Sequence, residues 1–322
     1  KIFIDLNNQL KAIIDEIWNI STTVEVYYQL IKDSQLLNEI NKGVLTSEEI
    51  NTLTQSKFDG YHIELEDLPA IFLLYQLLNG KSDISYDHII IDEVQDFSPL
   101  MLKIIKQFSS LNSMTLVGDL SQSIHAYRGL NNWDILEDIF SRQKFEVMKI
   151  NKNYRNTKEI VNLTNRILSE TQKDKEKPLP TPINRSGPEP NIKTFIYHQG
   201  MIRGISKEID QIQDSYQFEN IALITKSKDE AEDLYLKLSK GDNKQTLEIL
   251  TDEDGKYSGG VVCLPIELAK GLEFEAAIVV NASNSRYKKE VPYDGQLLYV
   301  ATTRALHYLA VFSVHRVSKY FD

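Results

Sequence analysis

The chain has 322 residues, of which 42% are hydrophobic and 25% are charged, and its formal net charge is −10. These values are typical of a soluble globular protein with one to three domains, and they argue against a nucleic-acid coat protein that is basic over its whole surface. A local basic or aromatic groove is still compatible with them. The single cysteine, Cys263, excludes an intrachain disulfide and favours a cytoplasmic protein. No run of 18 apolar residues occurs, so no membrane-spanning helix is predicted.

Residues 1–85 are expected to be mostly helical. Apolar residues recur at helical spacing in 6–20. A second helix is expected after Thr46 or Ser47, with Glu49 completing a capping box. A third, strongly apolar helix is expected near 66–80, since Pro69 suits its first turn and Gly80 its end. This much apolar surface indicates that the helical segment packs on, or is inserted in, a larger α/β body.

From residue 86 onwards, predicted strands and helices alternate, as in βαβ units. The apolar run at 86–92 is typical of a buried parallel strand. Thr157 is the expected N-cap of the helix predicted at 157–171. Residues 172–191 contain five of the nine prolines and are expected to form an exposed connector. The predicted strands are 86–92, 113–119, 144–150, 192–197, 220–225, 246–250, 260–265, 275–281 and 309–314, and the predicted helices of this part are 99–111, 132–142, 157–171, 227–240 and 296–306.

These elements predict an α/β protein with two tandem units, 86–150 and 151–322, joined near residue 150. In open α/β sheets ligands bind at the carboxyl ends of the strands. Asp92 and Glu93 directly follow three isoleucines at such an end. An Asp there can hold Mg²⁺, and the next acid can deprotonate an attacking water. The alternative is an ordinary acidic surface turn, which three preceding isoleucines disfavour.

Other polar residues add to this hypothesis. Gln122 follows the next predicted strand and is a candidate sensor of a γ-phosphate. Tyr127 and Arg128 combine an aromatic ring with a guanidinium, a pair that suits nucleic-acid contact, although a packing role for Tyr127 is equally compatible. Arg155 and Arg304 are candidates for stabilising the charge of a transferred phosphoryl group; taken alone, each is more typical of a surface ion pair.

The segment before the strand at 275–281 carries two further candidates. Gly271 permits close backbone approach to a ligand, and Glu273 offers an acceptor for a ribose hydroxyl. The alternative for both is a polar turn that leads into a strand.

Five segments in this order resemble the motifs of superfamily 1 helicases of the UvrD/Rep/PcrA type. "IIIDEVQD" resembles motif II, "VGDLSQSIHAYRG" motif III, "NYRNT" motif IV, "LAKGLEFE" motif V and "LYVATTRAL" motif VI. The resemblance implies two RecA-like domains of the P-loop NTPase fold, the first incomplete, and ATP and Mg²⁺ as cofactors. It implies that Asp92 holds Mg²⁺, Glu93 activates water, Tyr154 stacks near the adenine, and Glu273 contacts the ribose. Gln122, Arg155 and Arg304 would contact the γ-phosphate, and Tyr127 would stack on a DNA base.

The sequence departs from the helicase pattern in four respects. No GxxxxGK[ST] loop and no adenine-reading glutamine motif occur, motif V lacks its histidine, and "DLSQ" replaces a more acidic motif III. The short spacing between motifs IV and V resembles the HelD branch, which uses ATP to release RNA polymerase from nucleic acid. We therefore expect a HelD-like motor whose phosphate loop precedes Lys1, so that these 322 residues alone hydrolyse ATP negligibly. The alternatives are a UvrD/Rep-type helicase that acts on single-stranded or duplex DNA, and a helicase-fold interaction module without catalysis.

Overall fold

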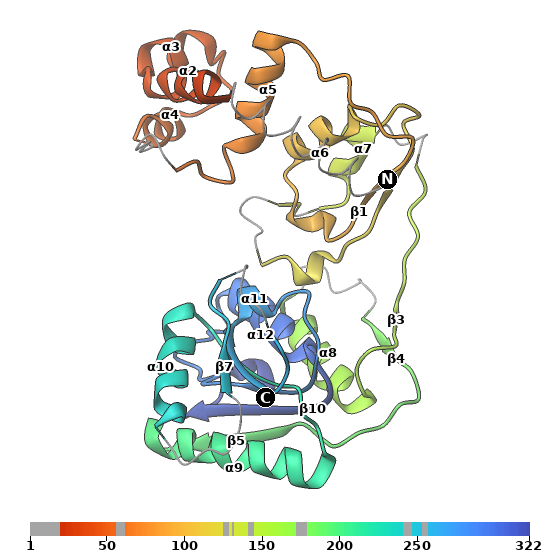
Figure 1. The fold of residues 1–322 in the computed structure, drawn as a ribbon, viewed down its shortest axis with the longest axis vertical. Helices are drawn as coiled ribbons and strands as arrows, with labels where there is room; N and C mark the ends of the chain where they lie inside the picture. Colours follow the sequence, from red (N-terminus) through yellow and green to blue (C-terminus); the bar gives the residue numbers. More distant parts are fainter. Residues whose placement is uncertain are drawn as a thin grey trace. The chain divides into compact units, whose positions relative to one another are not determined.

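A computed structural model describes residues 20–55, 62–124, 129–130, 132–140, 145–171, 179–240, 247–252 and 257–322 (Figure 1). The chain divides into two compact units, the first within Lys1–Gly118 and Tyr127–Lys144 and the second within Asp119–Ala126 and Phe145–Asp322. The predicted α/β class with parallel sheets is confirmed and is consistent with a RecA-like fold. The predicted domain boundaries at 85 and 150 stay predictions.

Helices dominate the beginning of the first unit. Thr46 and Glu49 form the expected capping box of α4: the Glu49 amide donates to Thr46 Oγ1 at 3.2 Å, and the Thr46 amide donates to Glu49 Oε2 at 2.7 Å. Asp67 accepts hydrogen bonds at 2.8 Å from the hydroxyls of Tyr27 and Tyr28, which ties α2 to the start of α5. The predicted helix within 6–20 falls almost wholly outside the described residues. The helices are α2 (Ile20–Lys32), α3 (Ser34–Ile40), α4 (Ser47–Thr54) and α5 (Leu68–Asn79).

The remainder of the first unit holds a parallel pair of short strands. β1 (Ile89–Ile91) pairs in register with β2 (Met114–Leu116). The expectation that the isoleucine strand is buried throughout is wrong for Ile90, whose side chain is 71% exposed, because the strand alternates its faces and only Ile91 is buried. The other elements are the 3-10 turn η1 (Val94–Asp96), α6 (Pro99–Lys106) and α7 (Ile135–Phe140).

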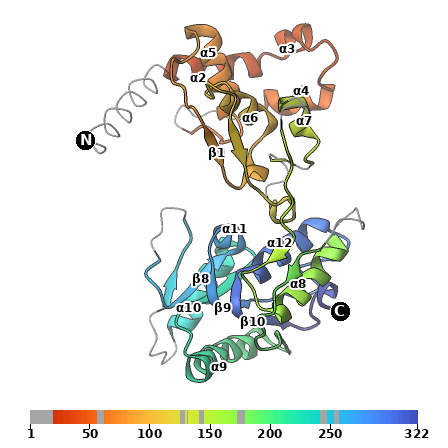
Figure 2. The same cartoon turned by 90° about the vertical axis from the view of Figure 1, so that its right-hand side faces the viewer.

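The second unit is a six-stranded parallel sheet with the order β5-β10-β9-β6-β8-β7. Side chains of β6 alternate between two hydrophobic cores: Ala222 and Ile224 belong to the core formed with α8, α11 and α12, and Ile221 and Leu223 belong to the core formed with α9 and α10. Figure 2 shows α8 and α12 on one side of this sheet and α9 on the other. Cys263 of β8 is a buried free thiol in the second core. Burial raises its pKa to about 12.

The elements of the second unit match most of the predicted ones. Its strands are β3 (Lys152–Asn153), β4 (Thr181–Pro182), β5 (Asn191–Phe195), β6 (Ile221–Thr225), β7 (Leu247–Ile249), β8 (Val261–Pro265), β9 (Phe274–Val279) and β10 (Ala305–Val314). Its helices are α8 (Lys158–Thr171), α9 (His198–Tyr216), α10 (Lys228–Ser239), α11 (Ile266–Ala269) and α12 (Pro292–Thr303), with the 3-10 turns η2 (Leu120–Gln122) and η4 (Lys319–Phe321).

Four sequence-based expectations differ from the structure. The strand expected at 144–150 is absent from its described part, 145–150; backbone pairing starts only where the Thr181 amide donates to the Asn151 carbonyl at 2.7 Å. The 19-residue helix α9 was not predicted, although Met201, Ile205 and Ile209 recur every four residues. Thr157 does not cap α8 with its side chain, since its buried Oγ1 has no hydrogen-bond partner among the described residues.

The fourth difference concerns the proline-rich connector. Its described part, from 179 onwards, is not a free surface segment. The Asn165 side chain donates to the Pro180 carbonyl at 2.8 Å, and Leu179 packs against the core that contains α8. Residues 172–178 of the connector lie outside the described part of the chain. Among the helices that the structure describes, none combines the length and the apolar character needed to cross a membrane.

Candidate functional site

The two adjacent acids of the first unit occupy a tight turn at the carboxyl end of β1. Asp92 is exposed, and its Oδ1 accepts a hydrogen bond from the Glu93 amide at 2.8 Å. Glu93 has φ 51° and ψ 39°, in the left-handed region, before the chain enters η1. Such a backbone is uncommon for a residue with a long side chain, and it concentrates at functional sites, where surrounding structure maintains it.

The carboxyl ends of β1 and β2 lie side by side. The Val117 amide donates to the Ile91 carbonyl at 2.8 Å, and the Val94 amide donates to the Val117 carbonyl at 2.9 Å. Gln95, for which the sequence predicted no role, is buried beneath this turn, and its side-chain amide donates to Glu93 Oε2. No pattern in the sequence distinguishes Gln95 from an ordinary loop residue.

The first unit has a group that fits Mg²⁺. Magnesium binds through one or two carboxylates together with water and substrate phosphates. An exposed carboxylate at a strand end, as Asp92 supplies, is such a ligand. The phosphates of a nucleotide are often bound by a GxxxxGK[ST] loop. These 322 residues contain no such loop.

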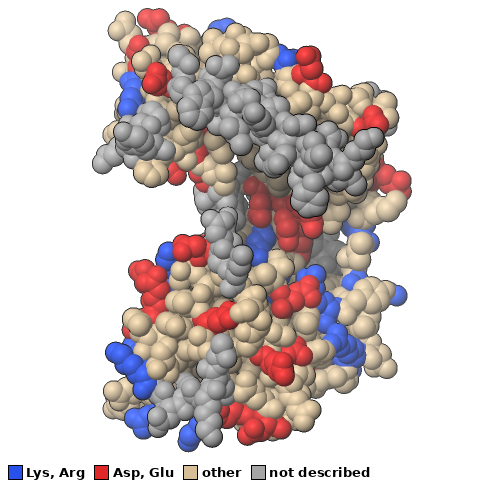
Figure 3. Space-filling view, in the orientation of Figure 1, with Lys and Arg blue, Asp and Glu red and all other residues tan. Residues whose placement is uncertain are grey.

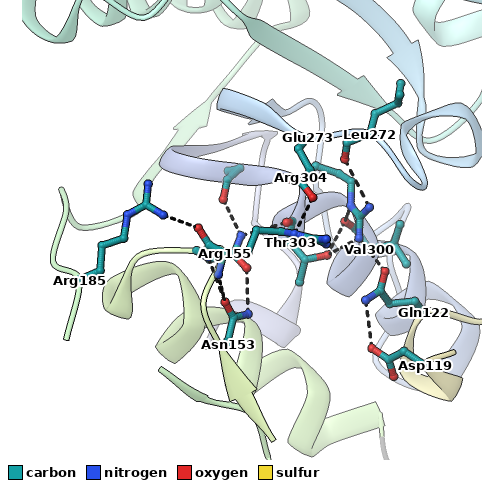
Figure 4. Close-up of polar contacts among 12 residues, drawn as sticks. Asp119, Gln122, Asn153, Arg155, Arg185, Leu272, Glu273, Val300, Thr303 and Arg304 are labelled. Atoms are coloured by element: carbon teal, nitrogen blue, oxygen red, sulfur yellow. Dashed lines mark hydrogen bonds and ion pairs between the residues drawn. The ribbon is translucent and has the colours of Figure 1, made fainter. Parts of the chain in front are cut away.

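Arg304 is the centre of a buried polar cluster in the second unit (Figure 4). The residue is 1% exposed, at the end of α12. Its guanidinium donates to Gln122 Oε1 at 2.7 Å, to the Val300 carbonyl at 3.1 Å and to Thr303 Oγ1 at 3.1 Å. Gln122 Nε2 donates in turn to Asp119 Oδ2 at 3.0 Å. A buried cation requires such hydrogen bonds, and this chain of contacts links the predicted sensor Gln122 to Arg304.

Arg155 belongs to the same unit but has a different environment. Its Nε lies 2.6 Å from Glu273 Oε1, and the two side chains are 48% and 38% exposed. Asn153 Oδ1 accepts a hydrogen bond from the Arg155 amide at 2.9 Å, and Arg185 donates to the Arg155 carbonyl at 2.8 Å. Glu273 directly follows Leu272, whose carbonyl accepts a bond of 3.4 Å from Arg304. Arg155, Glu273, Arg304 and Gln122 are therefore brought into one region of the second unit.

The loop that carries Arg155 is fastened to the strand that follows Arg304. Asn156 Nδ2 donates to the carbonyls of Thr303 at 3.0 Å and Ala305 at 2.6 Å. The role of Asn156 was not predicted, although it lies within the quoted "NYRNT" segment. Arg185 was missed as well, because it lies in the proline-rich connector, where no sequence signal marks it.

The remaining predicted residues are less constrained. Gly271 has φ 78°, a conformation that favours glycine, and a Cβ built there would meet no atom within 4 Å. The positive φ, rather than a lack of room for a side chain, therefore explains why a glycine occupies position 271. Tyr154 is 63% exposed, and its stacking on adenine stays a prediction. Tyr127 and Arg128 lie outside the described residues.

Asp92 and Glu93 follow the parallel strand β1 at its carboxyl end, which is where open α/β proteins bind their ligands. Glu273 and Arg304 instead directly precede β9 and β10. Comparisons with known families identify this chain more closely. The UvrD/REP helicase N-terminal domain matches residues 19–143, and two UvrD-like helicase C-terminal domain models match residues 148–243 and 260–312. These matches span most of the chain, which belongs to the UvrD-like helicases of superfamily 1.

Two curated relatives agree with this assignment. A probable DNA helicase II homolog of Mycoplasma capricolum subsp. capricolum is 25% identical over 50% of this chain and 23% of the relative. A second one, from Mycoplasma genitalium, is 31% identical over 44% of this chain and 20% of the relative. The chain thus matches about a fifth of the length of these curated relatives. The C-terminal domain of a possible DNA helicase from Lactobacillus plantarum WCFS1 is 29% identical, with a TM-score of 0.42, over 52% of this chain and 92% of that structure.

The matches correct one expectation from the sequence. The curated relatives are named as DNA helicases, and none of those compared above supports the HelD branch or RNA polymerase as a partner. The helicase alternative is therefore better supported than the polymerase-recycling hypothesis.

Proposed function

We propose that the protein carrying this chain is an ATP-dependent DNA helicase or translocase of the UvrD type, and that this chain forms part of its ATPase motor. The observation that supports this most directly is the convergence of Arg155, Glu273, Gln122 and Arg304 within the second unit. These are four of the residues that the helicase motifs assign to the nucleotide, and they come from four segments that are separated in the sequence.

In this proposal the first unit performs the hydrolytic step. Asp92 would hold Mg²⁺, which supplies charge neutralisation at the phosphates when bound. Glu93 would accept a proton from the attacking water as that water adds to the γ-phosphorus, and the bond to the leaving phosphate oxygen would break. The exposed position of Asp92 and the partial burial of Glu93 suit these different tasks.

The second unit would bind the nucleotide and stabilise the transferred group. Arg155 and Arg304 would contact the γ-phosphate, Gln122 would sense it, Tyr154 would stack on the adenine, and Glu273 would accept from the ribose. Gly271 would allow the backbone close to the nucleotide. Arg155 and Glu273 are paired in the structure, and Arg304 is buried with its guanidinium bonded to Gln122. The proposal therefore requires that Arg155 and Glu273 exchange their contact for the nucleotide and that Arg304 becomes accessible to the γ-phosphate.

DNA is the proposed partner. On the face shown in Figure 3, the second unit presents both acidic and basic side chains. Because the formal net charge of the chain is −10, affinity for DNA would depend on local contacts rather than on a broad positive field. Tyr127 and Arg128 remain the proposed base and phosphate contacts.

The test is ATP hydrolysis by the full-length protein, with and without single-stranded DNA. We expect DNA-stimulated turnover that Glu93→Gln reduces by about 10²–10⁴-fold, the usual contribution of a general base. Glu64→Gln, an exposed acid of the same unit, is the matched control and should leave turnover unchanged. The 322-residue chain alone is expected to hydrolyse ATP negligibly. A folded full-length protein without DNA-stimulated turnover, or with undiminished turnover in Glu93→Gln, would refute the proposal.

A further inference from the structure

We propose that Gln95 is a positioning residue for Glu93 and that two glycines, Gly118 and Gly129, are required because they leave the space that Gln95 occupies. This inference rests on the proposed function, in which Glu93 is the base. Gln95 has no exposed surface, and its Nε2 donates to Glu93 Oε2. Its own carbonyl accepts a hydrogen bond from the Leu130 amide at 2.8 Å.

Gly118 follows β2 and meets the side chain of Gln95. A Cβ built on Gly118 would collide with Gln95 Oε1 and would come within 2.9 Å of Val94 Cγ1. Gly118 does not have a positive φ, so its glycine is not explained by backbone conformation. The close approach of the Gln95 amide to the backbone after β2 accounts for it.

Gly129 meets the same residue from another segment, and at a different atom. A Cβ on Gly129 would collide with the carbonyl oxygen of Gln95 and would lie 3.2 Å from Asp96 Cα. Gly129 likewise lacks a positive φ. Gln95 is thus enclosed from two directions, with its side chain bounded by Gly118 and its backbone bounded by Gly129 and Leu130.

This enclosure has a specific consequence for Glu93. A partly exposed glutamate samples several rotamers, and fixing one of them costs conformational entropy at the moment of reaction. The amide of a residue that cannot itself move holds Oε2 in place, which orients Oε1 as the acceptor of the proton. A base oriented before the reaction contributes to turnover without contributing to nucleotide affinity.

The first test separates turnover from binding in the full-length protein. Gln95→Met keeps the length of the side chain and removes its amide, so we expect kcat to fall by roughly 10–100-fold while the Kd for a fluorescent ATP analogue stays within about twofold. Gln76→Met is the matched control, because Gln76 is another buried glutamine of the first unit. Its kcat should be that of the wild type.

The outcomes separate the two proposals. Wild-type protein without ATPase activity would overturn the proposed function, and the role of Gln95 with it. Active wild-type protein with an unchanged kcat in Gln95→Met, or with kcat lowered equally by Gln76→Met, would overturn the positioning role alone.

The second test uses the 322-residue chain and needs no activity. Gly118→Ala and Gly129→Ala should both lower the urea midpoint of the first unit. In a Gln95→Ala background the effect of Gly118→Ala should shrink by roughly half, because one of its two collisions is removed, whereas the effect of Gly129→Ala should stay, since it collides with a backbone atom. Equal effects of Gly118→Ala in both backgrounds would contradict the proposed enclosure.

Discussion

The two parallel sheets of the molecule differ in how they bury their side chains. Ile224 lies in β6 of the second unit, with neighbouring strands on both sides, and it has no exposed surface. Ile90 lies in the middle of β1, which pairs with β2 in the described part of the first unit, and most of its side chain is exposed. Two isoleucines that both lie in parallel strands thus differ in burial: one strand has neighbours on both sides, and the other pairs with a single strand among the described residues. The proposed catalytic acids stand on the sheet that contributes less burial.

The difference in burial between the two sheets can be tested most directly by truncating one isoleucine in each. Ile224→Ala should lower the free energy of unfolding of the second unit by about 2–5 kcal/mol, since it removes methyl groups from a packed core. Ile90→Ala should change that of the first unit by about 0.5 kcal/mol or less, as for other surface substitutions. Hydrogen exchange of the β1 and β6 amides, resolved by mass spectrometry, measures both. A loss at Ile90 as large as that at Ile224 would show that β1 is covered in solution.

The buried arginine gives the next largest effect. Arg304→Met should lower the stability of the second unit by about 2–4 kcal/mol, because the Val300 carbonyl and the Gln122 side-chain carbonyl would lose a buried donor. Arg166→Met, at an exposed position of α8, is the control and should cost less than about 0.5 kcal/mol. Urea unfolding followed by circular dichroism measures the two variants. Similar midpoints for them would mean that the Arg304 contacts contribute little in solution.

The exposed ion pair of the same region should have the smallest effect. Arg155 and Glu273 remain largely accessible to water, so their coupling should be about 0.2–1 kcal/mol and should decrease in high salt. A double-mutant cycle with Arg155→Met and Glu273→Gln, at two salt concentrations, measures this coupling. Coupling above about 2 kcal/mol, or coupling indifferent to salt, would show that the pair is a structural contact and would weaken the proposal that a nucleotide displaces it.

Sequence patterns predicted the second unit well where burial and periodicity coincide. The strands β6 and β8 and the last four residues of β9 are almost entirely apolar, because both faces of a central parallel strand are covered. The capping box of Thr46 and Glu49 was predictable for a different reason, since it depends only on neighbours within one turn.

Other features depend on contacts that local pattern does not encode. The segment 145–150 has the composition of a strand, but a strand also needs a partner, and pairing begins only at Asn151. Thr157 has a hydroxyl that could cap α8, but its Oγ1 makes no hydrogen bond among the described residues.

The candidate site shows the same limit. The sequence identified Asp92 and Glu93 as acids at a strand end, and Arg155 and Arg304 as candidates for stabilising a transferred phosphoryl group. It did not indicate that Arg155 pairs with Glu273, that Arg304 is buried against Gln122, or that Glu93 has a left-handed backbone supported by Gln95. Each of these depends on a side chain that comes near only when separate segments fold together.

The buried thiol in β8 makes the opening of the second unit measurable by chemical labelling. Cys263 is the sole cysteine, it lies within the core under α9 and α10, and its raised pKa keeps it protonated at neutral pH. A thiol reagent modifies the thiolate and must reach it, so modification has to wait for the sheet to open. The rate of labelling therefore counts opening events of one particular layer, in the unaltered protein, under the same conditions in which nucleotide or DNA is added.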